Sequence, residues 1–288
     1  MGNALVLDQT AQPALSVHVS PQLLELLREG AVEVDYLKVG PWLGRENVPT
    51  LDSDRPLLFH SDLTLSGSQP LSPATLAETQ AWLTLTGSPW LSAHIGFSCE
   101  AVIWEQTFVP APGTRLLSRN EARANIVRNA RQLAAAIPVP LLLENIPRFF
   151  NRAHDHVTAP DFVAQVIAET GCGLLLDLAH ARVSAAALGY AVPDYLARLP
   201  LARTVEIHVS GPRWQDGVLT DSHEPLQEED YRLLAWVLER TRPRMVTLEY
   251  ARDKAALAEQ IYRLQRLLGE ITLQVRNHQD TKNTKEKL

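Results

Sequence analysis

Eight short apolar runs alternate with helix-like stretches along this chain, and this alternation constrains the fold more than any other feature. Near-continuous apolar strands that are each followed by a helix are typical of a parallel sheet whose outer face is covered. Eight such units predict an α/β fold, a single closed (β/α)8 TIM barrel. An open doubly wound sheet is the rival, but it normally carries a Gly-rich phosphate turn after an early strand, and the sequence has none there. The runs cover residues 15–19, 34–39, 57–60, 91–94, 141–144, 174–177, 204–208 and 245–249.

The stretches between the runs carry helical signals, several with apolar residues at i, i+3, i+4 and i+7. Ser118 followed by Glu121 predicts a capping box, and Gly171 is expected to close a helix. The barrel is predicted to span 14–270, after an N-terminal segment, 1–13. Residues 271–288 lose the apolar period and are predicted to form a polar, disordered tail. The expected helices lie within 21–30, 72–87, 118–137, 159–171, 192–199, 227–241 and 254–269.

Six of the runs end on a residue that can bind a metal, at intervals of about one strand-helix unit. Active sites of such barrels gather at the carboxyl ends of the strands, so these residues are expected to meet. Three more candidates join these six. His180 is three positions after Asp177, across a strand-to-loop turn. Asp221 and His223 are two positions apart, so an extended backbone would aim their side chains the same way. The six strand-end residues are His60, His94, Glu144, Asp177, His208 and Glu249.

This ligand set indicates a metal centre at the carboxyl ends of the strands. A single carboxylate there can pair with a neighbouring Arg or Lys, and a lone strand histidine is more often a hydrogen-bonded core residue. Several carboxylates buried at one barrel mouth without a cation are costly, which favours the metal. Imidazole and carboxylate donors without thiolate favour iron, zinc or manganese, and composition does not choose among them.

Charge and cysteine content narrow the class of protein. Lys and Arg (27) against Asp and Glu (33) give a net charge of −6, which argues against a nucleic-acid surface. Two cysteines, Cys99 and Cys172, are too few for a disulfide framework. The sequence shows neither a basic head followed by a long apolar stretch nor a run long enough to cross a membrane. We therefore expect a soluble, cytoplasmic enzyme with no nucleic-acid or membrane partner.

Other polar residues receive weaker predictions. His18, on the first run, is expected in the core or the pocket wall rather than among the ligands, and His154 lies in a loop that could touch substrate. Five residues are predicted to bind substrate or to orient the ligands: Asn145, Lys38, Arg182, Glu206 and Trp214.

Several motifs together resemble the DUF692 family, also called the multinuclear non-haem iron-dependent oxidative enzymes. The most specific are LLLEN, GLLLD, EIH followed by SG, and DSHEPL, in this order, and the resemblance runs from about Leu15 to Leu268. It implies a xylose-isomerase-type barrel with two or three iron ions. It also implies oxidative rearrangement of cysteine or other residues in ribosomally made precursor peptides, often with a small partner protein that presents the peptide.

Residue by residue, the resemblance carries over to eight of the nine candidate ligands and makes Glu144 the natural bridge between ions. His180 stands where many relatives have Asn, and a histidine at this point resembles the ligand set of trinuclear zinc barrels. Lys38 and Gly40 stand where family members show a glutamate-rich strand end. The chemistry implied is that one ferrous ion binds the substrate, through a thiolate, and activates dioxygen, while a neighbouring ferric ion anchors the substrate.

Three alternatives of other classes remain. A sugar isomerase or epimerase with manganese or magnesium needs a group for proton transfer, for which Lys38 and Glu206 are the candidates. A trinuclear zinc phosphodiesterase of the endonuclease IV type uses nearly the same nine ligands, His180 included. A metal-storing module without catalysis would have every coordination position filled by protein. The identity and number of the bound ions discriminate among these classes.

Overall fold

Eight parallel strands close into a barrel, as the sequence predicts. The computed structural model describes residues 12–51 and 53–285. Around the barrel the strands follow the order β1-β12-β9-β8-β7-β4-β3-β2, with every neighbouring pair parallel. The barrel strands are β1 (Ala14–His18), β2 (Tyr36–Val39), β3 (Leu57–Ser61), β4 (Leu91–His94), β7 (Leu141–Glu144), β8 (Gly173–Asp177), β9 (Thr204–Val209) and β12 (Met245–Leu248).

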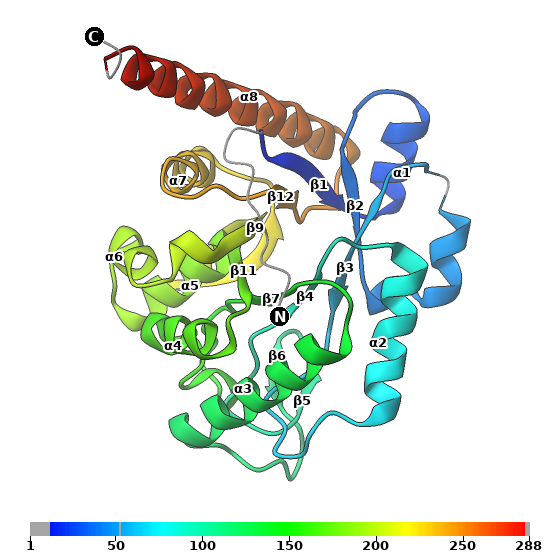
Figure 1. The fold of residues 1–288 in the computed structure, drawn as a ribbon, viewed down its shortest axis with the longest axis vertical. Helices are drawn as coiled ribbons and strands as arrows, with labels where there is room; N and C mark the ends of the chain where they lie inside the picture. Colours follow the sequence, from blue (N-terminus) through cyan, green and yellow to red (C-terminus); the bar gives the residue numbers. More distant parts are fainter. Residues whose placement is uncertain (1–11, 52, 286–288) are drawn as a thin grey trace.

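Helices cover the outside of the barrel (Figure 1). Among the residues that the structure describes, the connection after β2 has two short 3-10 helices, η1 (Pro41–Leu43) and η2 (Arg45–Thr50), in place of an α-helix. The expected caps are present: Ser118 and Glu121 form the capping box of α3, and Gly171 ends α4 with a φ of 73°. The helices are α1 (Pro21–Arg28), α2 (Pro73–Thr86), α3 (Arg119–Ala136), α4 (Pro160–Thr170), α5 (Leu178–Leu188), α6 (Val192–Ala197), α7 (Glu228–Leu238) and α8 (Lys254–Lys285).

The chain departs from the sequence prediction at three places. Helix α5 begins directly after Asp177, where a strand-to-loop turn was expected. Helix α8 continues to Lys285, where regular structure was expected to end near residue 271, because no proline interrupts a segment rich in helix-forming residues. Two hairpins were not foreseen: β5 (Val102–Trp104) with β6 (Phe108–Pro110), and β10 (Gly211–Gln215) with β11 (Val218–Glu224). Residues 1–11 of the expected N-terminal segment lie outside the described part.

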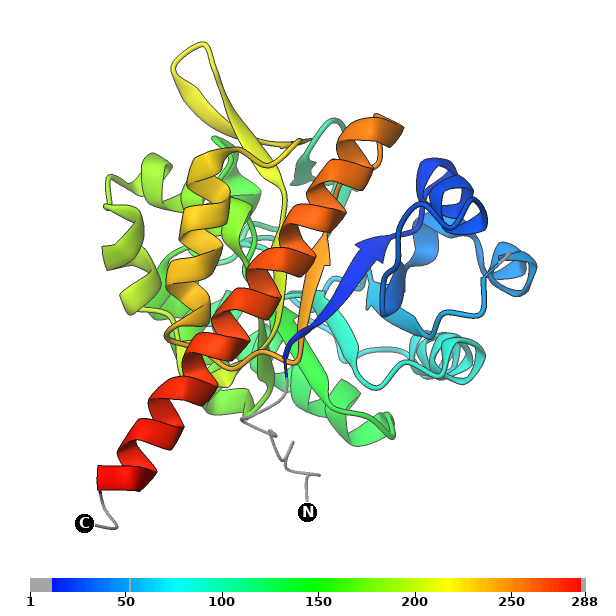
Figure 2. The same cartoon turned by 90° about the horizontal axis from the view of Figure 1, so that it is seen from above.

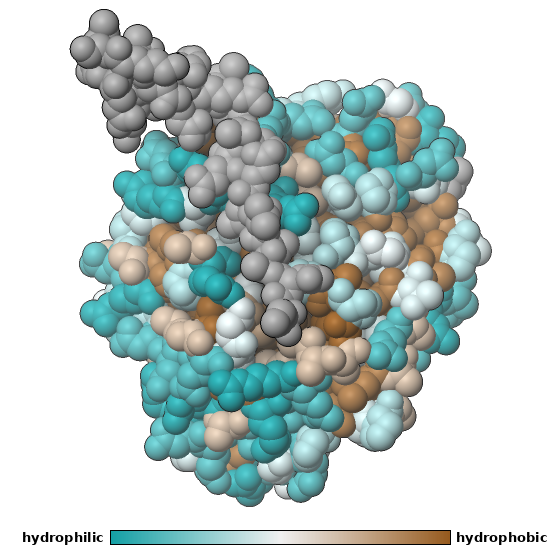
Figure 3. All heavy atoms as spheres, viewed as in Figure 1, coloured by the Kyte–Doolittle hydropathy of each residue, from teal (hydrophilic) through white to brown (hydrophobic). Residues whose placement is uncertain are grey.

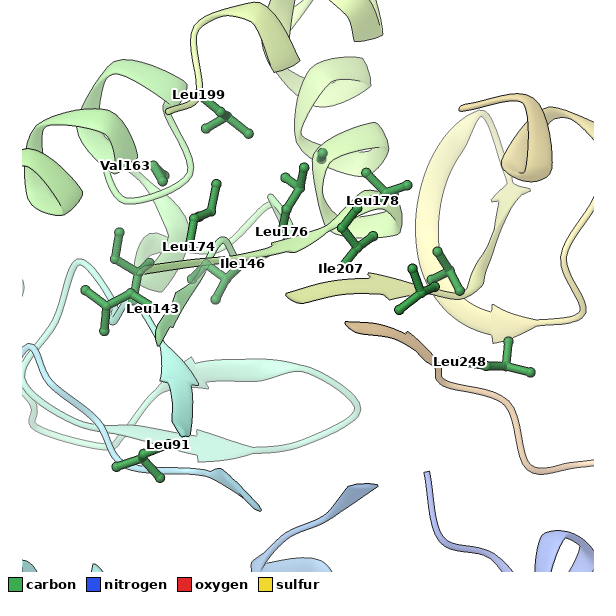
Figure 4. Close-up of a cluster of buried hydrophobic side chains, with 14 of the residues drawn as sticks. Leu91, Leu143, Ile146, Val163, Leu174, Leu176, Leu178, Leu199, Ile207 and Leu248 are labelled. Carbon is green, nitrogen blue, oxygen red and sulfur yellow. The ribbon is translucent and has the colours of Figure 1, made fainter. Parts of the chain in front are cut away.

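The main core lies between the strands and the helices. Figure 4 shows Leu174 and Leu176 on the same side of β8, towards the helices, as the alternation of side chains along a strand requires. The barrel interior is filled separately at its amino-terminal end by a small cluster that includes Trp90 and Leu142. None of the helices in the described residues is long and apolar enough to cross a membrane.

The two ends of the barrel differ. In Figure 2 the β10–β11 hairpin (yellow) projects beyond the barrel at the end where the strands finish. Figure 3 shows the opposite end, where hydrophilic residues surround scattered apolar patches. The two hairpins follow β4 and β9, so the chain adds its extra structure at the end where the strand-terminal ligands lie.

Candidate metal centre

Nine side chains that can bind a metal lie together at the carboxyl end of the barrel. Three are outside the barrel strands: His180 is in the first turn of α5, and Asp221 and His223 are on β11. The structure thus brings together every residue that the sequence predicts as a ligand. The remaining six end their strands: His60 on β3, His94 on β4, Glu144 on β7, Asp177 on β8, His208 on β9 and Glu249 directly after β12.

The nine residues form three groups, each with ligand atoms within 4.8 Å of one another. The first triad is His60, His94 and Glu144; the second is His180, Asp221 and His223; the third is Asp177, His208 and Glu249. A fourth combination, Glu144 with Asp177 and His180, meets the same limit, so the three triads are contiguous. Glu144 lies where the groups meet, 3.6 Å from His60 Nδ1 and 3.5 Å from His208 Nδ1.

Several ligand atoms are buried without a hydrogen-bond partner. They include Glu144 Oε2, Asp177 Oδ2, Asp221 Oδ1 and His208 Nδ1. An unpaired buried carboxylate oxygen is costly, and natural proteins rarely leave one without a partner or a cation. These atoms belong to all three triads, so cations bound there would satisfy them. The residues present therefore fit a multinuclear metal centre.

The orientation of His208 is set from beneath the site. Its Nε2 donates to Glu206 Oε1 over 3.1 Å, which leaves Nδ1 facing Glu249 and Glu144. A carboxylate on the far nitrogen of a ligating histidine fixes its tautomer and raises its basicity. Glu206 therefore has the place of a residue that orients a ligand.

Lys38 lies in the same polar layer, inside the barrel and below the triads. Its Nζ donates to Glu206 Oε1 over 2.7 Å and to Ser92 over 3.1 Å, and both Lys38 and Glu206 are fully buried. Thr247 Oγ1 and Trp90 Nε1 also donate to the Glu206 carboxylate. Burial acts to raise the pKa of Glu206, but the Lys38 ammonium holds it well below its usual range.

Asn145 ties β7 to β8 and orients two of the ligands. Its side-chain oxygen accepts from the Asp177 backbone N–H over 3.0 Å, and its side-chain nitrogen donates to the Asp177 carbonyl. Its backbone carbonyl accepts from His180 Nδ1 over 2.8 Å, which leaves His180 Nε2 towards Asp221. Asp177 in turn caps α5 by accepting from the His180 backbone N–H. The strand-to-helix junction thus fixes the spacing of Asp177 and His180.

The pKa shifts reflect the crowding of like and unlike charges. Burial, reinforced by the carboxylates of Glu249, Glu144 and Asp221, raises the pKa of Asp177 to about 7. Burial has the same tendency at Glu144, but the surrounding histidines, His208 foremost, lower its pKa to about 2. Without a cation, protons must therefore neutralise part of the site.

A cavity of about 860 Å³ opens above the triads. Seven of the nine candidate ligands line it, whereas Asp177 and His208 lie beneath its floor. The side towards β2 and the β5–β6 hairpin is aromatic, with Trp42, Trp104, Phe108 and Phe149. The side towards the β10–β11 hairpin is polar, with Gln215, Thr220, Ser222, Glu224 and Arg252. Its size is within the range of ligand-binding sites.

Both weakly predicted histidines lie in the cavity wall. His18 Nε2 is 2.8 Å from Glu249 Oε1, and its ring stacks on Trp42. His154 is buried between two backbone carbonyls, with Nδ1 2.7 Å from Pro147 O and Nε2 3.0 Å from Phe108 O. His154 thereby holds the β5–β6 hairpin against the loop after β7.

Arg182 and Trp214 do not line the cavity. Arg182 points to α7, where it pairs with Asp230 and Glu229. Trp214 is exposed on β10, next to Gln215, which lines the cavity. Because neighbouring residues of a strand face opposite ways, Trp214 lies on the outer face of the hairpin. Lys38 and Glu206 are also outside the cavity, so neither can transfer a proton to a substrate there.

The sequence did not reveal the aromatic wall, the β5–β6 hairpin that carries part of it, or the β10–β11 hairpin on the polar side. The Asp216-Gly217 pair was a usable signal, because both residues have positive φ (48° and 79°) and this dipeptide favours tight hairpin turns. For β5–β6 the signal was a pair of short β-prone apolar runs, VIW and FV, on either side of the polar EQT, although Gln106 takes a φ of 94° that its residue type does not predict.

Comparison with known families and proteins yields one family and a broader group of folds. A family model described as RiPP precursor modification enzyme MbnB/TglH/ChrH matches residues 27–271. A UPF0276 protein of Bordetella pertussis is 31% identical over 193 residues, 65% of this chain and 65% of the relative. A UPF0276 protein of Streptomyces avermitilis is 29% identical over 244 residues, 84% of this chain and 46% of the relative. The matches thus span less than two thirds of these relatives.

Solved structures share the barrel at low identity. A D-tagatose 3-epimerase-like protein aligns with a TM-score of 0.60 and 15% identity over 91% of this chain and 99% of its own. Endonuclease IV from Thermus thermophilus aligns with a TM-score of 0.56 and 19% identity over 90% of this chain and 100% of its own. At these identities the likeness establishes the fold, a xylose-isomerase-like TIM barrel, and not the reaction.

Proposed function

Because this chain belongs to the MbnB/TglH/ChrH family of RiPP precursor modification enzymes, the DUF692 family, we propose that it is a multinuclear iron enzyme. In this proposal it uses dioxygen to oxidise a residue, cysteine foremost, of a ribosomally made precursor peptide. One observation carries it: three contiguous triads of nitrogen and oxygen donors lie beneath an open cavity.

The donor set is compatible with iron. Imidazole and carboxylate ligands suit iron, zinc and manganese, whereas thiolate-rich sites select softer metals. Both cysteines are buried and neither lines the cavity, so a substrate thiolate would meet no competing thiol there. When bound, the iron ions supply electrons, dioxygen activation and an open position for the substrate.

The chain's own residues hold and orient this centre. Glu144 is placed to be shared between triads, as its contacts with His60 and His208 indicate. Glu206 and Asn145 set the tautomers of His208 and His180, so that each presents its free nitrogen to the site. Once a substrate covers it, the aromatic wall would exclude water from one side of the cavity, which would strengthen electrostatic interactions there.

We further propose that the substrate is a segment of a peptide, brought to the cavity with the help of a small partner protein. The cavity is open at the carboxyl end of the barrel and has room for a few residues. The family description, which concerns precursor peptides, supports the peptide rather than a free metabolite.

The alternative functions fit less well. An isomerase would need Lys38 or Glu206 at its substrate, but both are fully buried below the cavity. A storage module would have a closed site, whereas here seven candidate ligands face an open cavity. The trinuclear zinc phosphodiesterase remains the strongest competitor, because His180 completes a second triad with Asp221 and His223.

Metal analysis tests the proposal. Protein purified from a native-like host and reconstituted with iron is expected to hold about three iron ions per chain, one for each triad. Asp221→Asn should remove one of them, while Asp155→Asn, a carboxylate paired with Arg148 and Arg152, should remove none. With dioxygen and a precursor peptide the wild-type protein should change the peptide's mass. Three zinc ions with phosphodiester cleavage, a single manganese, or no bound metal would each refute the proposal.

A further inference from the structure

The aromatic and polar sides of the cavity stand over different metal triads. Trp42 lies beside His60, with ring centroids 6.3 Å apart, and Phe108 lies beside His94 at 5.6 Å, so the aromatic side covers the first triad. The second triad includes Asp221 and His223 of the β10–β11 hairpin, which forms the polar side. A substrate that spans the cavity therefore meets apolar rings at one end and hydrogen-bonding groups at the other.

Two indole rings on the aromatic side are exposed. Trp42 is 52% and Trp104 is 67% exposed, although both line the cavity. Tryptophan is highly buried on average, so exposed indoles beside a cavity indicate a surface that a ligand covers.

Both indoles are held in place by their surroundings. Trp42 stacks on His18 with centroids 5.2 Å apart and planes 20° from parallel, and it folds back over Gly40, where an added Cβ would lie 1.9 Å from its ring. Trp104 packs edge-on against Phe108 at 5.1 Å. It is carried by the hairpin whose turn contains Gln106 with a φ of 94°, a conformation that costs free energy and is common at ligand sites.

Two arginines in the segments that follow β6 and β7, Arg115 and Arg148, are already paired. Arg148 binds Asp155, and Arg115 binds Glu100 and Glu121. An acidic ligand group therefore finds both of these arginines occupied. The exposed indole rings favour an uncharged, planar group instead.

We infer that Trp42 and Trp104 bind an aromatic side chain of the substrate, next to the residue that enters the metal site. This inference rests on the proposed peptide substrate and adds a sequence requirement to it. Stacking or edge-on contacts with the two rings would orient the peptide, while its backbone lies towards the polar groups of β11. An aromatic pair contributes a few-fold to about tenfold in affinity beyond the area that it buries.

Calorimetric titration of the metal-loaded protein, without dioxygen, tests this inference. The probes are a five-residue peptide with a central cysteine among glycines, and the same peptide with phenylalanine on both sides of the cysteine. The aromatic peptide should bind about tenfold more tightly. Trp42→Ala and Trp104→Ala should each reduce that ratio several-fold, and the double variant should abolish it. Trp104→Phe, which keeps a ring, should retain most of it.

Trp214→Ala is the matched control, because Trp214 is 64% exposed but lies outside the cavity. It should bind both peptides as the wild type does. Metal content and melting temperature should be unchanged in all variants, since both cavity indoles are largely exposed. Equal binding of the two peptides to the wild type, or a preference that survives the double variant, would overturn the inference. So would an equal loss in Trp214→Ala, which would point to a protein-docking surface instead. Because binding is read out, these results do not depend on whether iron oxidises the peptide.

Discussion

Replacing Glu206 with glutamine should change both the stability of the barrel and its affinity for metal, by separate routes. Glu206 is fully buried, and its carboxylate accepts hydrogen bonds from Lys38, Thr247, His208 and Trp90. Glutamine keeps the shape but removes the charge and turns one oxygen into a donor. The change therefore leaves the Lys38 ammonium buried without a counter-ion and weakens the bond that fixes the His208 ring.

Two effects of different size follow. Breaking a buried ion pair by removing one partner costs about 3–5 kcal/mol, because a charge is left uncompensated. Loss of the hydrogen bond behind a metal-binding histidine lowers metal affinity by about 10- to 100-fold. The double variant Lys38→Met/Glu206→Gln removes both charges, so it should recover about 2 kcal/mol or more of the stability. It should not recover the metal affinity, since His208 still lacks its carboxylate partner.

Urea unfolding of the metal-free protein and competition with a chromophoric chelator measure the two effects. Glu78→Gln is the control, because its pair with Arg45 is exposed and should contribute no more than about 1 kcal/mol. The reasoning fails if Glu206→Gln unfolds within about 1 kcal/mol of the wild type. It also fails if the double variant is no more stable than Glu206→Gln, or if it binds metal normally.

Two further predictions concern pH and backbone strain. Burial raises the pKa of Asp177 to about 7, so below that pH a metal must displace its proton. This proton alone should lower the apparent metal affinity about fivefold as pH decreases from about 7 to 6. Chelator competition with no change over this range would contradict the protonation. In the metal-free protein the sign reverses, because a carboxyl with a raised pKa stabilises the fold while protonated and loses this contribution as pH rises through about 7. Gln106→Gly should stabilise the protein by about 1 kcal/mol in urea unfolding, since glycine adopts a φ of 94° without strain, whereas Gln106→Ala should give no gain.

The barrel and the convergence of the candidate ligands could be predicted because their signals are local. A parallel strand buried on both faces is a near-continuous apolar run, so the bounds of β7 match the sequence prediction at both ends. A polar residue at the end of such a run stands out against it. The sequence order of the units then places these ends at one face of the barrel, without knowledge of any contact.

The surroundings of the site could not be predicted in the same way, because they depend on register and on side chains far apart in the sequence. Lys38 and Glu206 are separated by 168 positions, and only the barrel's register places them in one buried layer. Arg182, which looked like a substrate-binding cation, is drawn away by two carboxylates of α7. Part of the aromatic wall depends on the β5–β6 hairpin, whose short strands carry weak signals. Helix α5 was missed because Asp177 both ends a strand and caps a helix.

The number of ions decides the charge of the proposed site. The triads contain four carboxylates, those of Glu144, Asp177, Asp221 and Glu249, while Glu206 is balanced by Lys38. Two divalent ions would neutralise these four charges, whereas three would leave an excess of about two positive charges beneath the cavity. An excess of that sign attracts an anionic group such as a thiolate and lowers its pKa. The second triad, completed by His180, therefore affects more than the number of ions. With it filled, the excess positive charge strengthens the preference of the site for the deprotonated substrate, and without it only direct coordination to an ion favours the thiolate.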